Sequence, residues 1–269
     1  MKDSAIGVFD SGVGGLTCVK ELINTLPNEN IIYLGDTARI PYGTRSAETI
    51  YEYALQDAAF LQEHNVKMII VACGTVSSVM LKRPIFDKTR LFTGVVYPAA
   101  AQAVKSTKNK KIGVIGTSAT IKSGSYEQAI KELDPDITVV TKACPMFVPL
   151  VENGYTDPND TVALTVAKDY LKIMQDEGVD TMIMGCTHYP LLEEVFKNIL
   201  GDEVELVSSG AEAAKYAKRI LWQEGLLSDR KEPGTAELYC TDSVELFTEN
   251  VENFLGHNIN ARISQCVLK

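Results

Sequence analysis

A short apolar run, a loop containing glycine or threonine, and a helical pattern follow one another repeatedly along this chain of 269 residues. The unit occurs at residues 5–9, 31–35 and 68–72, and it starts again at residues 111–117 and 181–184. Strands that alternate with helices of this length form parallel sheets covered by helices. The repeat therefore predicts an α/β protein of two pseudo-symmetric lobes, each a mostly parallel sheet flanked by helices.

The order of the predicted elements divides the chain between these lobes. Residues 1–96 and 208–269 are predicted to form lobe A, because two short crossovers are the simplest way to build a two-lobed hinge. Residues 97–207 are predicted to form lobe B. Loops at the carboxyl ends of parallel strands carry functional groups. We therefore expect the active site in the cleft between the lobes.

The composition is that of a globular protein, with 45% hydrophobic and 23% charged residues. No apolar run approaches the ~18 residues that a membrane-spanning helix requires. Asp10 also follows the first apolar run too soon for a signal peptide. We therefore expect a cytoplasmic protein without membrane contact. The formal charge of −9 also disfavours nucleic-acid binding, which requires clustered lysine and arginine.

Two of the six cysteines lie at predicted strand ends, and each is followed closely by a threonine. Cys73 directly follows residues 68–72, and Cys186 comes shortly after residues 181–184. A single cysteine at such a position is most often a small buried hydrophobic residue. The paired placement nevertheless favours two thiols on opposite walls of one cleft. We interpret the remaining cysteines as structural: Cys18, Cys144, Cys240 and Cys266.

The sequence indicates neither a metal nor a cofactor. The cysteines show no C-x-x-C spacing, and Cys186 with His188 forms a C-x-H pair that lacks further ligands. The glycine-rich turn after Asp10 is a poor dinucleotide fingerprint, because Thr17 stands where that motif has glycine or alanine. The same turn could still offer free backbone N–H groups to a substrate carboxylate.

Two opposed thiols are suited to proton transfer at the Cα atom of an amino acid. One thiolate removes the proton from one face, and the other thiol delivers a proton to the opposite face. A thiol pKa near ~8.5 can be moved toward neutrality by a neighbouring cation or a helix N-terminus. His188 and Asp10 are the candidates to tune the two thiols. Asp10 could equally be a helix N-cap, and His188 a structural histidine.

Several motifs occur in order along the chain: Phe9 to Gly15, Pro41-Tyr42-Gly43, Ala72-Cys73-x-Thr75, Ile115-Gly116-Thr117, and Gly185 to Pro190. With these motifs the chain resembles the glutamate racemases of the aspartate/glutamate racemase superfamily from residue 6 to about residue 210. The resemblance implies a cofactor-independent isomerase that interconverts L- and D-glutamate, supplying D-glutamate for peptidoglycan and thus for cell shape.

The resemblance also implies roles for individual residues. Cys73 and Cys186 would be the catalytic acid/base pair, with Cys73 acting on the D-isomer's proton and Cys186 on that of the L-isomer. Asp10, Glu152 and His188 would be auxiliary ionisable groups. Substrate contacts are expected from Asp10, Ser11, Tyr42, Gly43, Gly74, Thr75, Thr117, Thr120, Thr187 and His188. Each hydroxyl residue taken alone is more often a turn or helix-cap residue.

Gly74 departs from the family pattern, which has asparagine between the cysteine and the threonine. Glycine lacks the amide that would hydrogen-bond the substrate, and it adds backbone freedom. A lost hydrogen bond costs about 1–3 kcal/mol. Lower activity, another substrate preference, or a water molecule in the gap are all open. From the sequence we expect Gly74→Asn to raise or preserve glutamate turnover.

Other functions remain open from the sequence. The nearest is a racemase of the same superfamily that acts on aspartate or another amino acid. A two-lobed binding protein without catalysis is a different class, and a zinc or redox role would require bound metal or a Cys73–Cys186 disulfide. A homodimer is possible, because apolar residues near Tyr97, Phe147 and Trp222 could lie in the core or in an interface.

Overall fold

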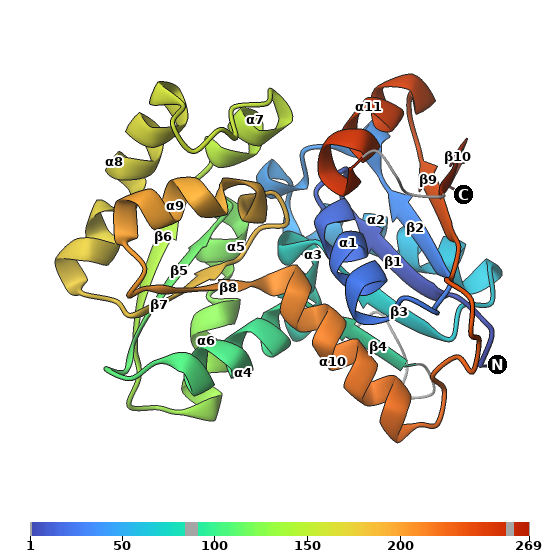
Figure 1. Ribbon diagram of the computed structural model, residues 1–269, viewed down its shortest axis with the longest axis horizontal. Helices are drawn as coiled ribbons and strands as arrows, with labels where there is room; N and C mark the ends of the chain where they lie inside the picture. Colours follow the sequence, from blue (N-terminus) through green and yellow to red (C-terminus); the bar gives the residue numbers. More distant parts are fainter. Residues whose placement is uncertain (1, 84–90, 257–260, 269) are drawn as a thin grey trace.

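The computed structural model describes residues 2–83, 91–256 and 261–268, and these contain two sheets (Figure 1). The six-stranded sheet has the order β10-β9-β2-β1-β3-β4, and the four-stranded sheet has the order β6-β5-β7-β8. Neighbouring strands are parallel in both. The strands are β1 Ile6–Asp10, β2 Ile31–Gly35, β3 Met68–Val71, β4 Leu91–Gly94, β5 Lys111–Gly116, β6 Thr138–Ala143, β7 Thr181–Met184, β8 Glu205–Ser208, β9 Ala236–Cys240 and β10 Ala261–Gln265.

Helices cover the two sheets (Figure 1). Short side chains cap several of them: the Asp160 carboxylate accepts hydrogen bonds from two amides of the first turn of α8, and the Ser46 hydroxyl accepts one from the amide of Thr49 in α2. The helices are α1 Leu16–Thr25, α2 Ala47–Glu63, α3 Gly74–Lys82, α4 Val96–Ser106, α5 Ser118–Ser123, α6 Ser125–Leu133, α7 Phe147–Glu152, α8 Thr161–Glu177, α9 Glu193–Leu200, α10 Ser209–Gln223 and α11 Val244–Leu255. Single 3₁₀ turns lie at Thr37–Arg39, Tyr42–Thr44 and Tyr189–Leu192.

The predicted fold class is confirmed, since both halves of the chain form parallel sheets flanked by helices. All residues of β1, β3 and β7 are buried, as expected for parallel strands with helices on both faces. β9 pairs with β2, so the C-terminal part of the chain returns to the six-stranded sheet. The lobe boundaries at residues 96 and 207 stay a prediction, and the names lobe A and lobe B are kept for these parts.

The structure contains elements that the sequence pattern did not predict. β10 continues the six-stranded sheet beyond β9, and its residues are only half-buried or exposed. An edge strand of this kind lacks the apolar run that predicts a buried strand. The helices α5 and α9 were also missed, and the apolar segment at 143–152 contains a short helix, α7.

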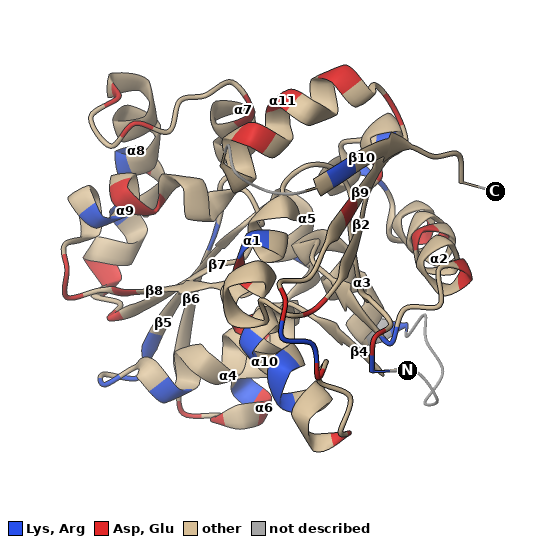
Figure 2. Ribbon diagram, turned by 45° about the vertical axis from the view of Figure 1, so that its right-hand side comes forward, with Lys and Arg blue, Asp and Glu red and all other residues tan. Residues whose placement is uncertain are grey.

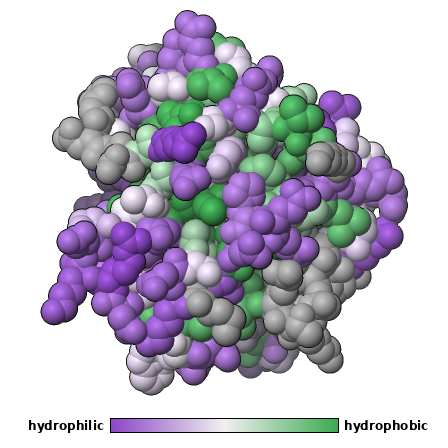
Figure 3. All heavy atoms as spheres, turned by 90° about the vertical axis from the view of Figure 1, so that its right-hand side faces the viewer, coloured by the Kyte–Doolittle hydropathy of each residue, from purple (hydrophilic) through white to green (hydrophobic). Residues whose placement is uncertain are grey.

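The outer surface is mixed in charge and in polarity. Lysine, arginine, aspartate and glutamate are spread over helices and loops, whereas the strands carry few of them (Figure 2). Hydrophilic side chains cover most of the face seen in Figure 3, with smaller apolar areas between them. Tyr97 and Trp222 are exposed, whereas Phe147 is buried in the core. Within the described ranges, no helix combines the length and the apolar character needed to cross a membrane.

A buried ion pair holds the C-terminal part of the chain against the six-stranded sheet. Lys67 precedes β3 and pairs with Glu29, which precedes β2, and their side chains are only 1% and 3% exposed. The Lys67 ammonium also donates to the carbonyl of Leu226, and the amide of Ser228 donates to Glu29. The pair therefore joins the starts of two strands to the segment after α10.

We predict that Lys67→Ala lowers the free energy of unfolding by about 3 kcal/mol, because Glu29 would stay buried without its cation. Urea denaturation measures the change. Lys172→Ala is the matched control, since Lys172 pairs with Asp176 at the surface and should contribute less than about 1 kcal/mol. Equal effects of the two substitutions would contradict the prediction.

Candidate active site

A cavity of about 380 Å³ lies between the two lobes, at the carboxyl ends of strands from both sheets. Cys73 follows β3 of the larger sheet, and Cys186 follows β7 of the smaller sheet. Both thiols line the cavity, and both residues are more than nine-tenths buried. Besides these two, the cavity is lined by most of the predicted site residues: Ser11, Tyr42, Gly43, Gly74, Thr75, Thr117, Thr120, Glu152, Thr187 and His188.

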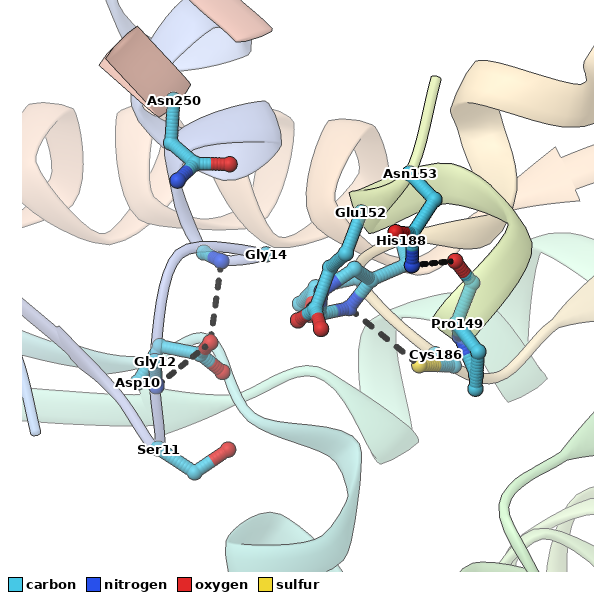
Figure 4. A network of polar contacts seen from close by, with 12 residues as sticks. Asp10, Ser11, Gly12, Gly14, Pro149, Glu152, Asn153, Cys186, His188 and Asn250 are labelled. Carbon is cyan, nitrogen blue, oxygen red and sulfur yellow. Dashed lines mark hydrogen bonds and ion pairs between the residues drawn. The ribbon is translucent and has the colours of Figure 1, made fainter. Parts of the chain in front are cut away.

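Asp10 is the predicted site residue that does not line this cavity. It ends β1, and its Oδ2 atom accepts hydrogen bonds from the amides of Gly15 at 3.0 Å and Gly12 at 3.3 Å (Figure 4). The glycine-rich turn therefore binds its own carboxylate, so the amides of Gly12 and Gly15 are not free for a substrate. Burial raises the pKa of Asp10, although the nearby His188 and the two amides act in the opposite direction.

Cys73 lies on the lobe A side of the cavity, at the N-terminus of α3. Its Sγ atom is 3.3 Å from the hydroxyl of Ser11. Burial and the charge of Asp10 raise the pKa of Cys73 to about 12. The hypothesis that this thiol is moved toward neutrality is therefore wrong. Cys73 carries its proton at pH 7, so it is available as an acid.

Cys186 has a different set of neighbours on the lobe B side. The Nδ1 atom of His188 is 3.9 Å from the Cys186 sulfur, and Nε2 is 2.9 Å from the carboxylate of Glu152, which ends α7 (Figure 4). Burial alone would lower the pKa of His188, but the hydrogen bonds and charges of Cys186 and Glu152 outweigh it and raise that pKa to about 10. An imidazolium therefore faces the sulfur of Cys186.

Three threonine hydroxyls meet across the cleft. Thr75 from α3 lies 3.2 Å from Thr117 and 3.4 Å from Thr120, and the last two are 3.0 Å apart. The side chain of Thr117 also caps α5 by accepting a hydrogen bond from the amide of Thr120. The cap interpretation is therefore confirmed for Thr117, and its role in substrate binding stays a prediction. Because hydroxyls both donate and accept, this cluster suits a carboxylate.

The segment 36–44 forms part of the cavity wall, through Ile40, Tyr42 and Gly43 among others. The Tyr42 side chain is 2% exposed, and its hydroxyl contacts the carboxylates of Asp36 and Asp57. Tyr42 therefore cannot offer that hydroxyl freely to a substrate. Sequence reasoning missed Asp57, because an aspartate in the middle of an amphipathic helix gives no signal for this contact.

Glycines permit close approaches of the two lobes. A Cβ atom at Gly14 would lie 2.3 Å from the Thr187 hydroxyl, and the nearby Thr17 hydroxyl donates to the Thr187 carbonyl at 2.8 Å. A Cβ atom at Gly74 would lie 2.4 Å from the carbonyl oxygen of Gly185. The positions of a Cβ at residue 74 and of the Gly185 carbonyl oxygen are both fixed by the backbone. A side chain at 74 would therefore force the segments bearing Cys73 and Cys186 apart. This contact argues against the expectation that asparagine at 74 preserves turnover, which stays a prediction.

Neither a metal cluster nor a disulfide is found at this site. All six cysteines are free thiols. Within residues 2–83, 91–256 and 261–268, no three His, Cys, Asp or Glu side chains are arranged to hold a metal ion. The disulfide that a redox role would require between Cys73 and Cys186 is therefore not formed in this structure.

Two parallel α/β lobes, each delivering a cysteine to one shared cavity, define a class of racemase-like isomerases. The model of one such family, described as Asp/Glu/Hydantoin racemase, matches residues 6–217, and the chain belongs to this family.

Known relatives extend the comparison over nearly the whole chain. A glutamate racemase from Geobacter metallireducens is 46% identical over 252 residues, which cover 94% of this chain and 93% of the relative. The crystal structure of a Bacillus anthracis glutamate racemase isoform has a TM-score of 0.94 at 39% identity and covers 100% of both chains. A Francisella tularensis glutamate racemase in complex with D-glutamate has a TM-score of 0.90 at 37% identity and covers 99% of this chain and 98% of its own.

We predict that Gly74→Asn lowers kcat/KM at least about tenfold, because the added Cβ displaces Gly185 and with it the neighbouring thiol. Gly74→Ala should lower it similarly, since the clash begins at Cβ. Steady-state racemisation assays measure the effect, and thermal unfolding separates it from a loss of fold. A Gly74→Asn variant as active as the parent would contradict the contact.

We also predict a change in pH dependence for Glu152→Gln. Removing the carboxylate lowers the pKa of His188, so the ring loses its proton at a lower pH. The alkaline limb of the kcat/KM profile should move to lower pH, whereas the exposed Glu127→Gln control should leave it in place. An unchanged profile in Glu152→Gln would show that His188 does not depend on this partner.

Proposed function

We propose that this protein interconverts L- and D-glutamate by proton transfer at Cα, with Cys73 and Cys186 as the acid/base pair. The observation that carries the proposal is that two strand-end thiols, 113 positions apart in the sequence, line one cavity between the lobes. The names of the relatives support glutamate as the substrate. The asymmetric surroundings of the thiols support opposite starting roles.

The reaction from L- to D-glutamate starts from a Cys186 thiolate beside imidazolium His188 and a protonated Cys73. Cys186 takes the Cα proton, and the electron pair of the broken C–H bond stays on the substrate. The Cys73 S–H bond then breaks as its proton is transferred to the opposite face of Cα. One proton has left and one has arrived, so the product differs only in configuration. The D- to L- direction uses the same steps with the roles exchanged.

The remaining groups bind the substrate and limit the charge that builds up. Preorganised dipoles stabilise a carbanion without a cofactor that would accept its electrons. The clustered hydroxyls of Thr75, Thr117 and Thr120 support carboxylate binding, and Ser11 and Thr187 line the same cavity. We therefore assign these five residues to substrate binding, and the site needs neither metal nor cofactor.

The cellular setting follows from the proposed reaction. D-Glutamate is a peptidoglycan component, so we place the protein in the cytoplasm, where its soluble substrate and the wall precursors are handled.

A homodimer is proposed as well, since Tyr97 and Trp222 leave apolar surface available at 45% and 71% exposure.

We predict that Cys73→Ser and Cys186→Ser each lower kcat/KM by about 10² or more, because serine is a far weaker acid than a thiol at neutral pH. Proton exchange at Cα of each glutamate isomer in deuterium oxide, followed by NMR, measures each half-reaction. The half-exposed Cys266→Ser variant is the matched control and should exchange at the parental rate.

The same experiment separates the rival functions. Exchange of aspartate that exceeds exchange of glutamate would support a racemase with another substrate. A binding protein would hold glutamate without exchanging its Cα proton, and this outcome would overturn the proposal.

A further inference from the structure

A group of four polar side chains lies behind the part of the cavity wall formed by segment 36–44. Arg39 and Tyr42 belong to this segment, Asp36 begins it, and Asp57 lies on α2. Both carboxylate side chains are fully buried, and the Arg39 side chain is 20% exposed. We call these four residues the Asp36–Asp57 cluster. The reaction steps above use none of them.

The carboxylate of Asp36 has donors for both of its oxygens. Its Oδ2 accepts from Nε of Arg39 and from the Tyr42 hydroxyl, and its Oδ1 accepts from the Thr241 hydroxyl at 2.9 Å. Both oxygens of Asp36 are therefore satisfied by hydrogen-bond donors of the protein.

The carboxylate of Asp57 has only one clear hydrogen-bond donor within the Asp36–Asp57 cluster. Its Oδ1 accepts from Nη2 of Arg39 at 3.1 Å, and its Oδ2 lies 3.3 Å from the hydroxyl oxygen of Tyr42. That hydroxyl has a single proton, and its shorter contact is with Asp36. A charged Asp57 would therefore place a buried, unpaired oxygen against the lone pairs of a phenol oxygen, an arrangement that is costly away from water.

A proton on Asp57 removes this conflict. The chain of donors then runs from Asp57 Oδ2–H to the Tyr42 oxygen, and from the Tyr42 O–H to Asp36. The surrounding charges favour the same form, because a single guanidinium, that of Arg39, pairs with both carboxylates, and Asp10 is a further acidic group nearby. Burial and the charge of Asp36 raise the pKa of Asp57 well above its usual range.

We propose that Asp57 is a positioning residue, which as a neutral carboxylic acid donates to Tyr42 and so fixes the Tyr42–Gly43 backbone in the wall of the substrate cavity. This assignment deepens the proposed function and rests on it. Gly43 faces Thr117 across the cleft, since a Cβ atom at Gly43 would lie 3.6 Å from that side chain. A shift of Tyr42 would therefore reach the hydroxyl cluster that binds the substrate.

Two substitutions at position 57 test whether Asp57 acts as a neutral hydrogen-bond donor or as a charged carboxylate. Asn has an amide that can donate to Tyr42 and a carbonyl that can accept from Arg39, so Asp57→Asn should keep KM for glutamate within about threefold of the parent. Asp57→Ala removes both contacts and should raise KM about tenfold, with a smaller change in kcat, because binding geometry and not proton transfer is affected. Asp57→Asn as impaired as Asp57→Ala would overturn the proposal.

Infrared difference spectroscopy tests the protonation state without any assay of activity. The carbonyl stretch of a protonated carboxylic acid should be present in the parent near neutral pH and lost in Asp57→Asn. The exposed Asp169→Asn variant is the control and should leave this band unchanged. A band of unchanged intensity in Asp57→Asn would show that Asp57 is charged, whereas a smaller remaining band can come from another buried carboxyl such as Asp10. The infrared measurement establishes the protonation state of Asp57 even if the parent fails to racemise glutamate, or if Asp57→Ala fails to fold.

Discussion

The close approach of two backbone segments at Gly74 and Gly185 sets the geometry on which the site depends. A Cβ atom at Gly74 would lie 2.4 Å from the Gly185 carbonyl oxygen, so only glycine permits this separation. Each glycine is bonded directly to one of the paired cysteines. The distance between the lobes and the distance between the thiols are therefore coupled, and proton transfer depends steeply on such distances.

The two thiols have different electrostatic surroundings, so the two walls of the cavity are not equivalent. Cys73 lies near Asp10 and keeps its proton, whereas Cys186 faces a histidine that Glu152 and the sulfur itself hold in its charged form. Under the proposed function, the identical side chains begin as acid and base because their neighbours differ, with Asp10 beside Cys73 and His188 beside Cys186. A reversible reaction requires that these states exchange, which the single-proton steps at each sulfur accomplish.

Groups outside the cavity keep its walls in place. The Asp36–Asp57 cluster anchors the wall segment that carries Tyr42 and Gly43, and the Lys67–Glu29 pair anchors the returning C-terminal segment. Both are buried polar clusters in which each charge has partners. Such clusters specify one arrangement of a loop more strictly than apolar packing does, and a cavity that distinguishes two faces of one carbon needs that rigidity.

The sequence by itself determined the α/β class, the parallel sheets and the pairing of Cys73 with Cys186, because apolar periodicity and strand-end motifs are local features. It missed the edge strand β10 and the role of Asp57, whose signals are weak or absent along the chain. Only the tertiary structure decided that Asp10 binds its own turn, that Tyr42 is engaged by two carboxylates, and that Gly74 is required by Gly185. These facts depend on contacts between segments distant in sequence and on burial, which changes the cost of charge, and neither can be read from residue order.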